Sequence, residues 1–133
     1  MRCNGKWSCR AALVMSYLSL TPYNAIAQDT PQINTNGNAF FAQCTPTSTS
    51  YTACVFYVIG LTDGLGLMNA GLQKAGQKEI FCMPGGTGLH SPVTGVQTVD
   101  LMMRYLQRHL EERHKPTMLV LVNTLKETFP CSG

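Results

Sequence analysis

The sequence has few charged residues, and most of its length carries no net charge. Only 13% of its 133 residues are Asp, Glu, Lys or Arg, which is about half of the usual share. The whole positive excess comes from Arg2, Lys6 and Arg10, and residues 28–133 contain seven basic and seven acidic residues. Nucleic-acid binding depends on clustered Lys and Arg side chains, so we expect no nucleic-acid partner. The 44% of apolar residues excludes a charge-rich disordered chain.

The N-terminus lacks an apolar run that is long enough to cross a membrane. The apolar run covers only residues 11–20, whereas a bilayer requires about 20 apolar residues. Basic residues precede this run, and Ala25 and Ala27 form the small-x-small pattern that signal peptidase cleaves. We therefore predict that residues 1–27 are a secretory signal peptide and that the protein is periplasmic, without membrane attachment after cleavage. An uncleaved anchor is disfavoured, because Pro22 and the polar residues after Ala27 supply no stop-transfer pattern.

Residues 28–37 are polar and contain Pro31 and an Asn36-Gly37 turn signal. We expect them to form a flexible N-terminal arm, which leaves residues 38–133 as the folded domain.

The mature chain also lacks closely spaced cysteines. Its four cysteines, Cys44, Cys54, Cys82 and Cys131, are separated by 10, 28 and 49 positions. Without a C-x-x-C pair we expect no metal site, and no cofactor is indicated. An even number of cysteines in an exported chain predicts two disulfides, for which three pairings are open.

Hydrophobic periodicity predicts an all-α domain. Thr94 and Gln97 form a capping box, and apolar residues follow it at helical spacing. The predicted helices are a short one capped by Asn38 that runs through Cys44, one over 51–72, one from about 95 to 112, and one from Pro116 to Phe129. Residues 53–61 could locally form a strand, but the apolar stretch is too long for a single strand.

The same periodicity predicts which faces are buried. The helix over 51–72 is apolar all round, which is typical of a central, buried helix. On the last two helices the predicted apolar stripes are Val96, Val99, Met103, Leu106 and Leu110, and Leu119, Val122, Leu125 and Phe129. We expect Ile59, Leu106 and Leu125 to be buried close to one another.

Candidate catalytic residues are weak, and we assign none. His90 and Ser91 are only neighbours in sequence, and His109 and His114 are too far apart around a helix to bind one metal ion. Asp63 lies in the most apolar helix, where we expect it to form a structural hydrogen bond to a neighbouring helix end. Gly60 and Gly64 are expected to permit close helix approach. An exported hydrolase is therefore disfavoured.

Several short motifs are specific when they are taken in order. They are Cys54-Val-Phe-Tyr57-Val-Ile-Gly60-Leu-Thr-Asp63, Phe81-Cys82-Met-Pro84, Thr94-x-x-Gln97, Arg104-Tyr105-Leu106, Arg113-His114-x-Pro116 and Phe129-Pro130-Cys131. This set resembles the Rap/Tai family of small exported immunity proteins, in which we expect Tyr57, Gly60 and Asp63 to be structural. The chain departs from the family in a longer loop after Cys82. It also has Leu110 where members often have Pro, so the helix could continue through Leu110.

The resemblance implies both a fold and a function. Family members neutralise type VI secretion effectors, notably peptidoglycan amidases. Their fold is similar to that of the periplasmic chaperone HdeA, a small disulfide-stapled orthogonal helical bundle. We therefore expect a non-enzymatic immunity or inhibitor protein that binds a secreted effector and could form a homodimer. The alternative is an HdeA-like periplasmic chaperone or housekeeping binding protein without a toxin partner.

The resemblance to HdeA also implies the disulfides Cys44–Cys82 and Cys54–Cys131. The main rival pairing is Cys44–Cys54 with Cys82–Cys131.

An inhibitor without chemistry of its own acts by shape, and the loop over residues 83–92 suits this role. Prolines stiffen its ends, and glycines let its backbone approach a partner closely. The predicted partner-binding residues are Pro84, Gly85, Gly86, Thr87, Gly88, Leu89, His90 and Ser91. Of these, Leu89 and His90 are the expected anchor side chains. An ordinary connecting loop is the alternative.

Overall fold

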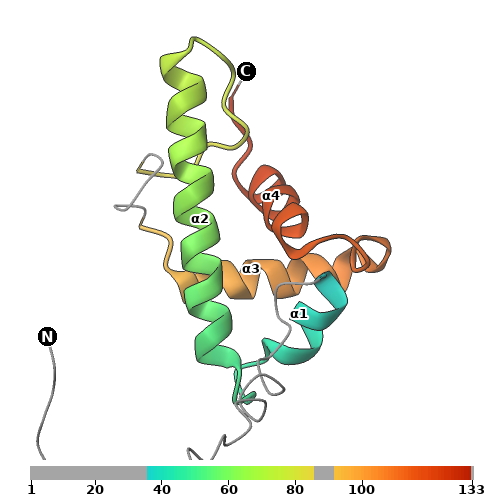
Figure 1. The fold of residues 1–133 in the computed structure, drawn as a ribbon. Helices are drawn as coiled ribbons and strands as arrows, with labels where there is room; N and C mark the ends of the chain where they lie inside the picture. The colour runs from blue at the N-terminus through green and yellow to red at the C-terminus, as the bar shows by residue number, and fades with distance from the viewer. Residues whose placement is uncertain (1–35, 86–91, 133) are drawn as a thin grey trace, which may run out of the picture. The chain divides into compact units, whose positions relative to one another are not determined.

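The computed structural model describes residues 36–85 and 92–132. The chain divides into two units, residues 1–30 and 31–133, and every described residue lies in the second unit. Its elements are α1 (Gly37–Gln43), α2 (Tyr51–Lys74), α3 (Gly95–Arg108), the short 3₁₀ helix η2 (Leu110–Glu112) and α4 (Thr117–Thr128) (Figure 1). The described residues contain no strand, and two disulfides join them. The predicted all-α, disulfide-stapled bundle is confirmed.

The N-cap of helix α1 lies two residues before the predicted one. The Asn36 side chain accepts a hydrogen bond of 3.0 Å from the amide of Ala39, so Asn36 and not Asn38 is the cap. The next two amides have partners far away in the sequence: that of Gly37 donates to the carbonyl of Lys115, and that of Asn38 donates to the carbonyl of Arg113, in the turn before α4. These long-range hydrogen bonds set where the helix starts, and local sequence could not reveal them.

Helix α2 buries only one stripe of its surface. Cys54, Val58 and Leu65 are buried in the core, while Phe56 is 69% exposed and Leu67 is 74% exposed. The expectation of a helix buried on all sides is wrong, because α1 and α3 pack against one side of α2 and leave the other uncovered (Figure 1). By length and composition α2 could also cross a membrane, a property that core helices of soluble proteins share.

Helix α3 crosses α2 rather than running alongside it (Figure 1). The crossing point is Gly95, where a Cβ atom would lie 2.5 Å from Cγ1 of Ile59. Ile59 therefore lies at the edge of the interface between α2 and α3 and is 37% exposed. The prediction that Ile59 is buried in the core is wrong. The predicted burial of Leu106 and Leu125 is confirmed, because both side chains are fully buried.

The capping box of α3 is confirmed, but the helix ends at Arg108 and does not continue through Leu110. The Nε of Arg113 donates at 2.8 Å to the carbonyl of Leu106. A continuing helix would pair this carbonyl with the amide of Leu110. The predicted apolar stripe of this helix is wrong at its two ends, because Val96 and Leu110 are exposed.

Helix α4 packs mainly against α3. Its buried residues include Val120, Leu121, Thr124 and Leu125, whereas Leu119, predicted to be buried, is 50% exposed. The spacing of apolar residues did not predict this buried face, because the polar residue Thr124 occupies one of its positions. The hydroxyl of Thr124 donates to the carbonyl of Val120, which satisfies the polar group inside the core.

The disulfides are Cys44–Cys54 and Cys82–Cys131, so the pairing implied by HdeA is wrong and the rival pairing is present. Cys44 ends α1 and Cys54 lies in the first turn of α2, and the short connection brings their Cα atoms to 5.7 Å. The amide of Cys82 donates to the carbonyl of Phe129, which places Cys82 beside the C-terminal tail. Cys131 follows α4 by three residues and pairs with Cys82 there.

Candidate partner-binding site

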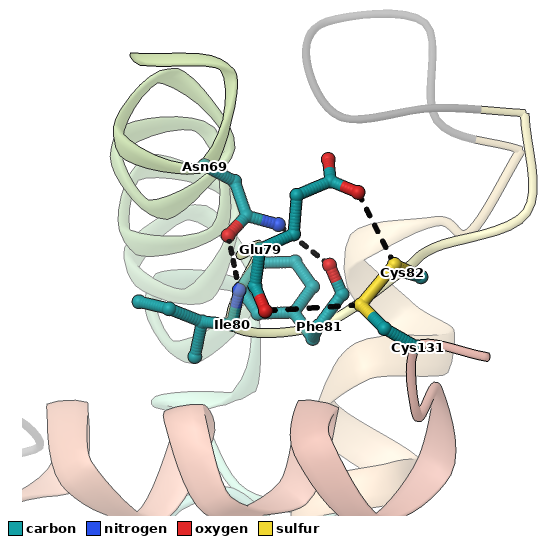
Figure 2. Close-up of a disulfide and its surroundings, with 6 residues drawn as sticks. All are labelled: Asn69, Glu79, Ile80, Phe81, Cys82 and Cys131. Atoms are coloured by element: carbon teal, nitrogen blue, oxygen red, sulfur yellow. Dashed lines mark hydrogen bonds between the residues drawn. A yellow bond between two sulfur atoms is a disulfide. The ribbon is translucent and has the colours of Figure 1, made fainter. Parts of the chain in front are cut away.

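The segment that leads into the predicted partner-binding loop is attached to α2 by one buried asparagine. Asn69 is fully buried, and its Oδ1 accepts a hydrogen bond of 2.8 Å from the amide of Ile80. Its Nδ2 donates to the carbonyl of Phe81. Figure 2 shows the two hydrogen bonds from one side chain to adjacent residues of the segment. Phe81 itself is fully buried, so residues 80–81 are fixed by polar and apolar contacts together.

The next residue of the segment is tied to the C-terminal tail. Besides the Cys82–Cys131 disulfide, the amide of Cys82 donates at 2.8 Å to the carbonyl of Phe129. A carboxylate oxygen of Glu79 lies 3.2 Å from Sγ of Cys82 (Figure 2). The ligand atoms of Glu79, Cys82 and Cys131 all lie within 4.8 Å of one another, so these three of the described residues could hold a metal ion once the disulfide is reduced.

The two ends of the loop lie close together. Gly85 has a φ of +80°, which favours glycine, and a Cβ atom there would lie 3.0 Å from Cδ of Pro92. Pro84, Gly85 and Pro92 are exposed. The remaining predicted binding residues, Gly86, Thr87, Gly88, Leu89, His90 and Ser91, lie outside the described residues.

A surface groove begins beside these loop ends and continues between α3 and α4. Its first part has a volume of about 420 Å³, and the second part has a volume of about 370 Å³. Both parts are lined by Leu101, Arg104 and Thr128. Arg104 is exposed and forms no ion pair with a described residue, whereas Arg108 pairs with Glu127 at 2.9 Å. The part of the groove beside the loop ends is mainly apolar, and the cationic side chain of Arg104 lines both parts.

The structure brings none of the predicted structural residues of α2 to the loop base. A Cβ atom on Gly60 or Gly64 would meet nothing within 4 Å, so the predicted close helix approach is wrong within this domain. Asp63 is half-buried and has no hydrogen-bond partner among the described residues, so the expected bond to a helix end is not found there. Tyr57 packs against the core, and its burial raises the pKa of the phenol.

The uncovered side of α2 is a second candidate surface. We define the α2 apolar face as the exposed apolar residues and glycines of α2 that lie away from α3, which are Ala53, Phe56, Gly60, Gly64, Leu67, Met68 and Gly71. The half-buried Asp63 lies at the edge of this face, four residues before Leu67. Contiguous exposed apolar patches are uncommon on soluble monomers and mark interaction sites.

Sequence reasoning missed both Asn69 and Glu79. The spacing contained a signal for Asn69, because it follows Leu65 by four residues on the buried stripe of α2. A polar residue on such a stripe requires a hydrogen-bond partner. Glu79 carried no comparable signal, since its proximity to Cys131 arises only from the fold.

The family model of Rap1a immunity proteins matches residues 36–131. This match begins at the cap of α1 and ends at Cys131, so it covers all the described helices. No curated protein and no solved structure matches the chain. The similarity of the fold to HdeA therefore stays a prediction.

Proposed function

The chain belongs to the Rap1a family of immunity proteins, and from this premise we propose that it binds and blocks a type VI secretion effector. A peptidoglycan amidase is the effector class that we propose, because the Rap/Tai family that the chain resembles notably neutralises such enzymes. The family assignment carries the immunity role, and the contacts of residues 79–85 and Pro92 support the loop as the inhibitory element.

The observation that favours the loop as the inhibitory element is the way its base is held. Asn69 fixes residues 80–81, the disulfide fixes Cys82, and Gly85 lies against Pro92. Holding a loop in advance lowers the ordering cost that binding otherwise carries. We propose that Leu89 and His90 enter the effector's cleft as anchors.

The groove beside the loop extends the proposed interface. A partner that receives the loop would rest against Pro84, Pro92 and α3, where Arg104 is available for a carboxylate. Such a rim charge contributes to specificity and association rate more than to affinity.

To test this function, an amidase effector is directed to the periplasm of a sensitive strain that expresses the protein. Wild type should protect the cells, and a variant with residues 85–90 replaced by a Gly-Ser segment should not. The matched control replaces residues 45–50, a second surface loop of equal length, and should still protect. Full protection by the 85–90 variant would place the binding surface elsewhere, and no protection by wild type against a panel of such effectors would refute the role.

We also propose export to the periplasm. Two disulfides suit an oxidising compartment, and residues 1–27 have the pattern of a signal peptide. N-terminal sequencing of the protein recovered from the periplasm should begin at Gln28. A sequence that begins at Met1 would contradict this.

A second copy of the chain is the occupant that we propose for the α2 apolar face. The face is nearly symmetric about residue 62, so two antiparallel copies of α2 would bring Gly60 against Gly64 and Phe56 against Met68. Such self-complementarity is what a two-fold interface requires, and the glycines would allow close approach.

Analytical ultracentrifugation of the mature protein should therefore show a dimer, which Leu67→Glu should dissociate. The control Gln73→Glu changes an exposed residue outside the face and should leave the dimer intact. A monomeric wild-type protein would refute this pairing.

The same apolar face favours the second candidate function, a periplasmic chaperone, because exposed apolar surface can hold unfolded chains. If the protein suppresses aggregation of an unfolded client at acidic pH, and Leu67→Glu abolishes this effect, the chaperone function is supported. Suppression that is equal in both proteins, or absent, counts against it.

A further inference from the structure

Three potential metal ligands converge at the base of the loop although the sequence contains no metal-binding motif. Glu79 and Cys82 lie on one segment, and Cys131 comes from the C-terminal tail 49 positions after Cys82. One ligand atom from each lies within 4.8 Å of the others, and all three residues are half-buried. In Figure 2 the Glu79 carboxylate points toward the pair of sulfur atoms.

The two disulfides of the domain differ in their access to solvent. Cys44 and Cys54 are fully buried within the apolar core. Cys82 and Cys131 are partly exposed. Thiol–disulfide exchange requires that the attacking thiolate reach a sulfur atom. A dithiol reductant should therefore reduce Cys82–Cys131 before it reaches the buried pair.

We propose that reduction of Cys82–Cys131 creates a binding site for a thiophilic divalent cation of the zinc class, with Glu79 as the third ligand. The reductant is a dithiol, which supplies two electrons and two protons and becomes a disulfide itself. The S–S bond breaks and two S–H bonds form. On binding, the cation displaces both thiol protons to water, and two thiolates and one carboxylate then coordinate it.

The ligand types and the local charge both suit this cation. Two sulfur ligands and one carboxylate are a set that zinc accepts, with water in the fourth position. Two thiolates and the Glu79 carboxylate would repel one another at this distance if no cation neutralised them. The bound divalent cation offsets two of the three negative charges, so the thiolates and Glu79 form one coupled site.

The fold holds the ligands near one another even without the disulfide. The hydrogen bond from Cys82 to Phe129 and the two bonds from Asn69 remain when the S–S bond is broken. Two sulfur atoms on one zinc ion lie roughly 3.8 Å apart, given Zn–S bonds of about 2.3 Å. The two sulfur atoms must therefore move apart once the S–S bond is broken. Cys131 can move, because it lies outside the helices, three residues after the end of α4 at Thr128.

The cation would replace the disulfide as the tie between residues 79–82 and the C-terminal tail. The reduced and oxidised proteins would then both keep the base of the loop closed. This inference depends on the side chains alone and does not depend on the proposed immunity function.

The test uses the full mature chain after mild reduction with a dithiol and its removal, with Co²⁺ as a spectroscopic probe and Zn²⁺ in equilibrium dialysis. We expect one cation per reduced chain, with a thiolate-to-cobalt charge-transfer band, and none on the oxidised protein. Glu79→Gln should weaken binding at least about tenfold, and Cys131→Ser should abolish the band. The matched control Asp100→Asn removes an exposed carboxylate on α3 and should bind as wild type does.

A second measurement on the wild-type chain avoids any variant that fails to fold. After mild reduction, alkylation followed by mass spectrometry should label Cys82 and Cys131 only, and Zn²⁺ should protect both from labelling. The proposal is overturned if the reduced chain binds no cation, if Glu79→Gln binds as tightly as wild type, or if Zn²⁺ leaves the labelling unchanged.

Discussion

Replacing Asn69 with alanine tests whether one side chain holds the base of the loop. Asn69 is the only described residue that hydrogen-bonds through its side chain to both Ile80 and Phe81. Alanine removes its donor and its acceptor together. The carbonyl of Phe81 and the amide of Ile80 then lose their partners, and no water can easily reach a carbonyl beside a fully buried side chain.

An unpaired buried polar group costs about 1–3 kcal/mol. The Phe81 carbonyl should bear the larger cost, because its hydrogen bond is buried and that of the Ile80 amide is only part-buried. We therefore expect Asn69→Ala to lower the free energy of unfolding by about 2–4 kcal/mol. In a domain of this size such a loss lowers Tm by at least about 8 °C.

Thermal and urea unfolding with both disulfides intact measure this loss, and hydrogen exchange locates it. The Ile80 amide should lose protection in Asn69→Ala but keep it in Asn69→Asp, which retains the acceptor oxygen. Gln73→Ala, an exposed change on the same helix, should stay within about 0.5 kcal/mol of wild type. A cost of Asn69→Ala below about 1 kcal/mol, or a still protected Ile80 amide, would refute the reasoning.

Three further predictions concern the core, the glycines and the response to acid. Leu106 is fully buried, so Leu106→Ala should cost about 2–5 kcal/mol in urea unfolding; a cost under about 1 kcal/mol would contradict its burial. Gly37→Ala should destabilise the fold, because its Cβ would lie 2.9 Å from Cδ2 of Leu106 and 3.0 Å from a backbone oxygen. Gly60→Ala should be neutral or stabilise by up to about 1 kcal/mol when it is measured in the Leu67→Glu variant, in which the proposed dimer is dissociated and the new Cβ atom lies in open space on a helix. Equal effects of the two changes would refute this contrast. The hydrogen bond and charge of Lys115 lower the pKa of Glu112. The stability from this pair is therefore present above the pKa of the unfolded glutamate and is lost as the pH falls through the lowered folded pKa. Glu112→Gln should flatten the acid side of the stability–pH curve, and an unchanged acid side would count against the pair.

Helix positions could be predicted from the sequence because they depend on neighbours along the chain. The Thr94–Gln97 capping box starts α3 through bonds between residues three apart. The apolar stretch of α2 is long enough to exclude a strand, and the structure confirms a helix there. Failures appeared where a distant group intervened, as when Arg113 ended α3 by occupying the carbonyl of Leu106.

The sequence by itself determined that this chain is all-α, carries two disulfides and belongs to an immunity-protein family, because local hydrogen bonds, cysteine number and short motifs are properties of the chain. Only the tertiary structure decided which cysteines pair, which side of α2 stays uncovered, and that Glu79 meets two sulfur atoms at the base of the loop. The physical reason is that a helix forms through contacts within a few residues. The face that it buries, and the segment that lies beside it, depend on packing between parts that are far apart along the chain.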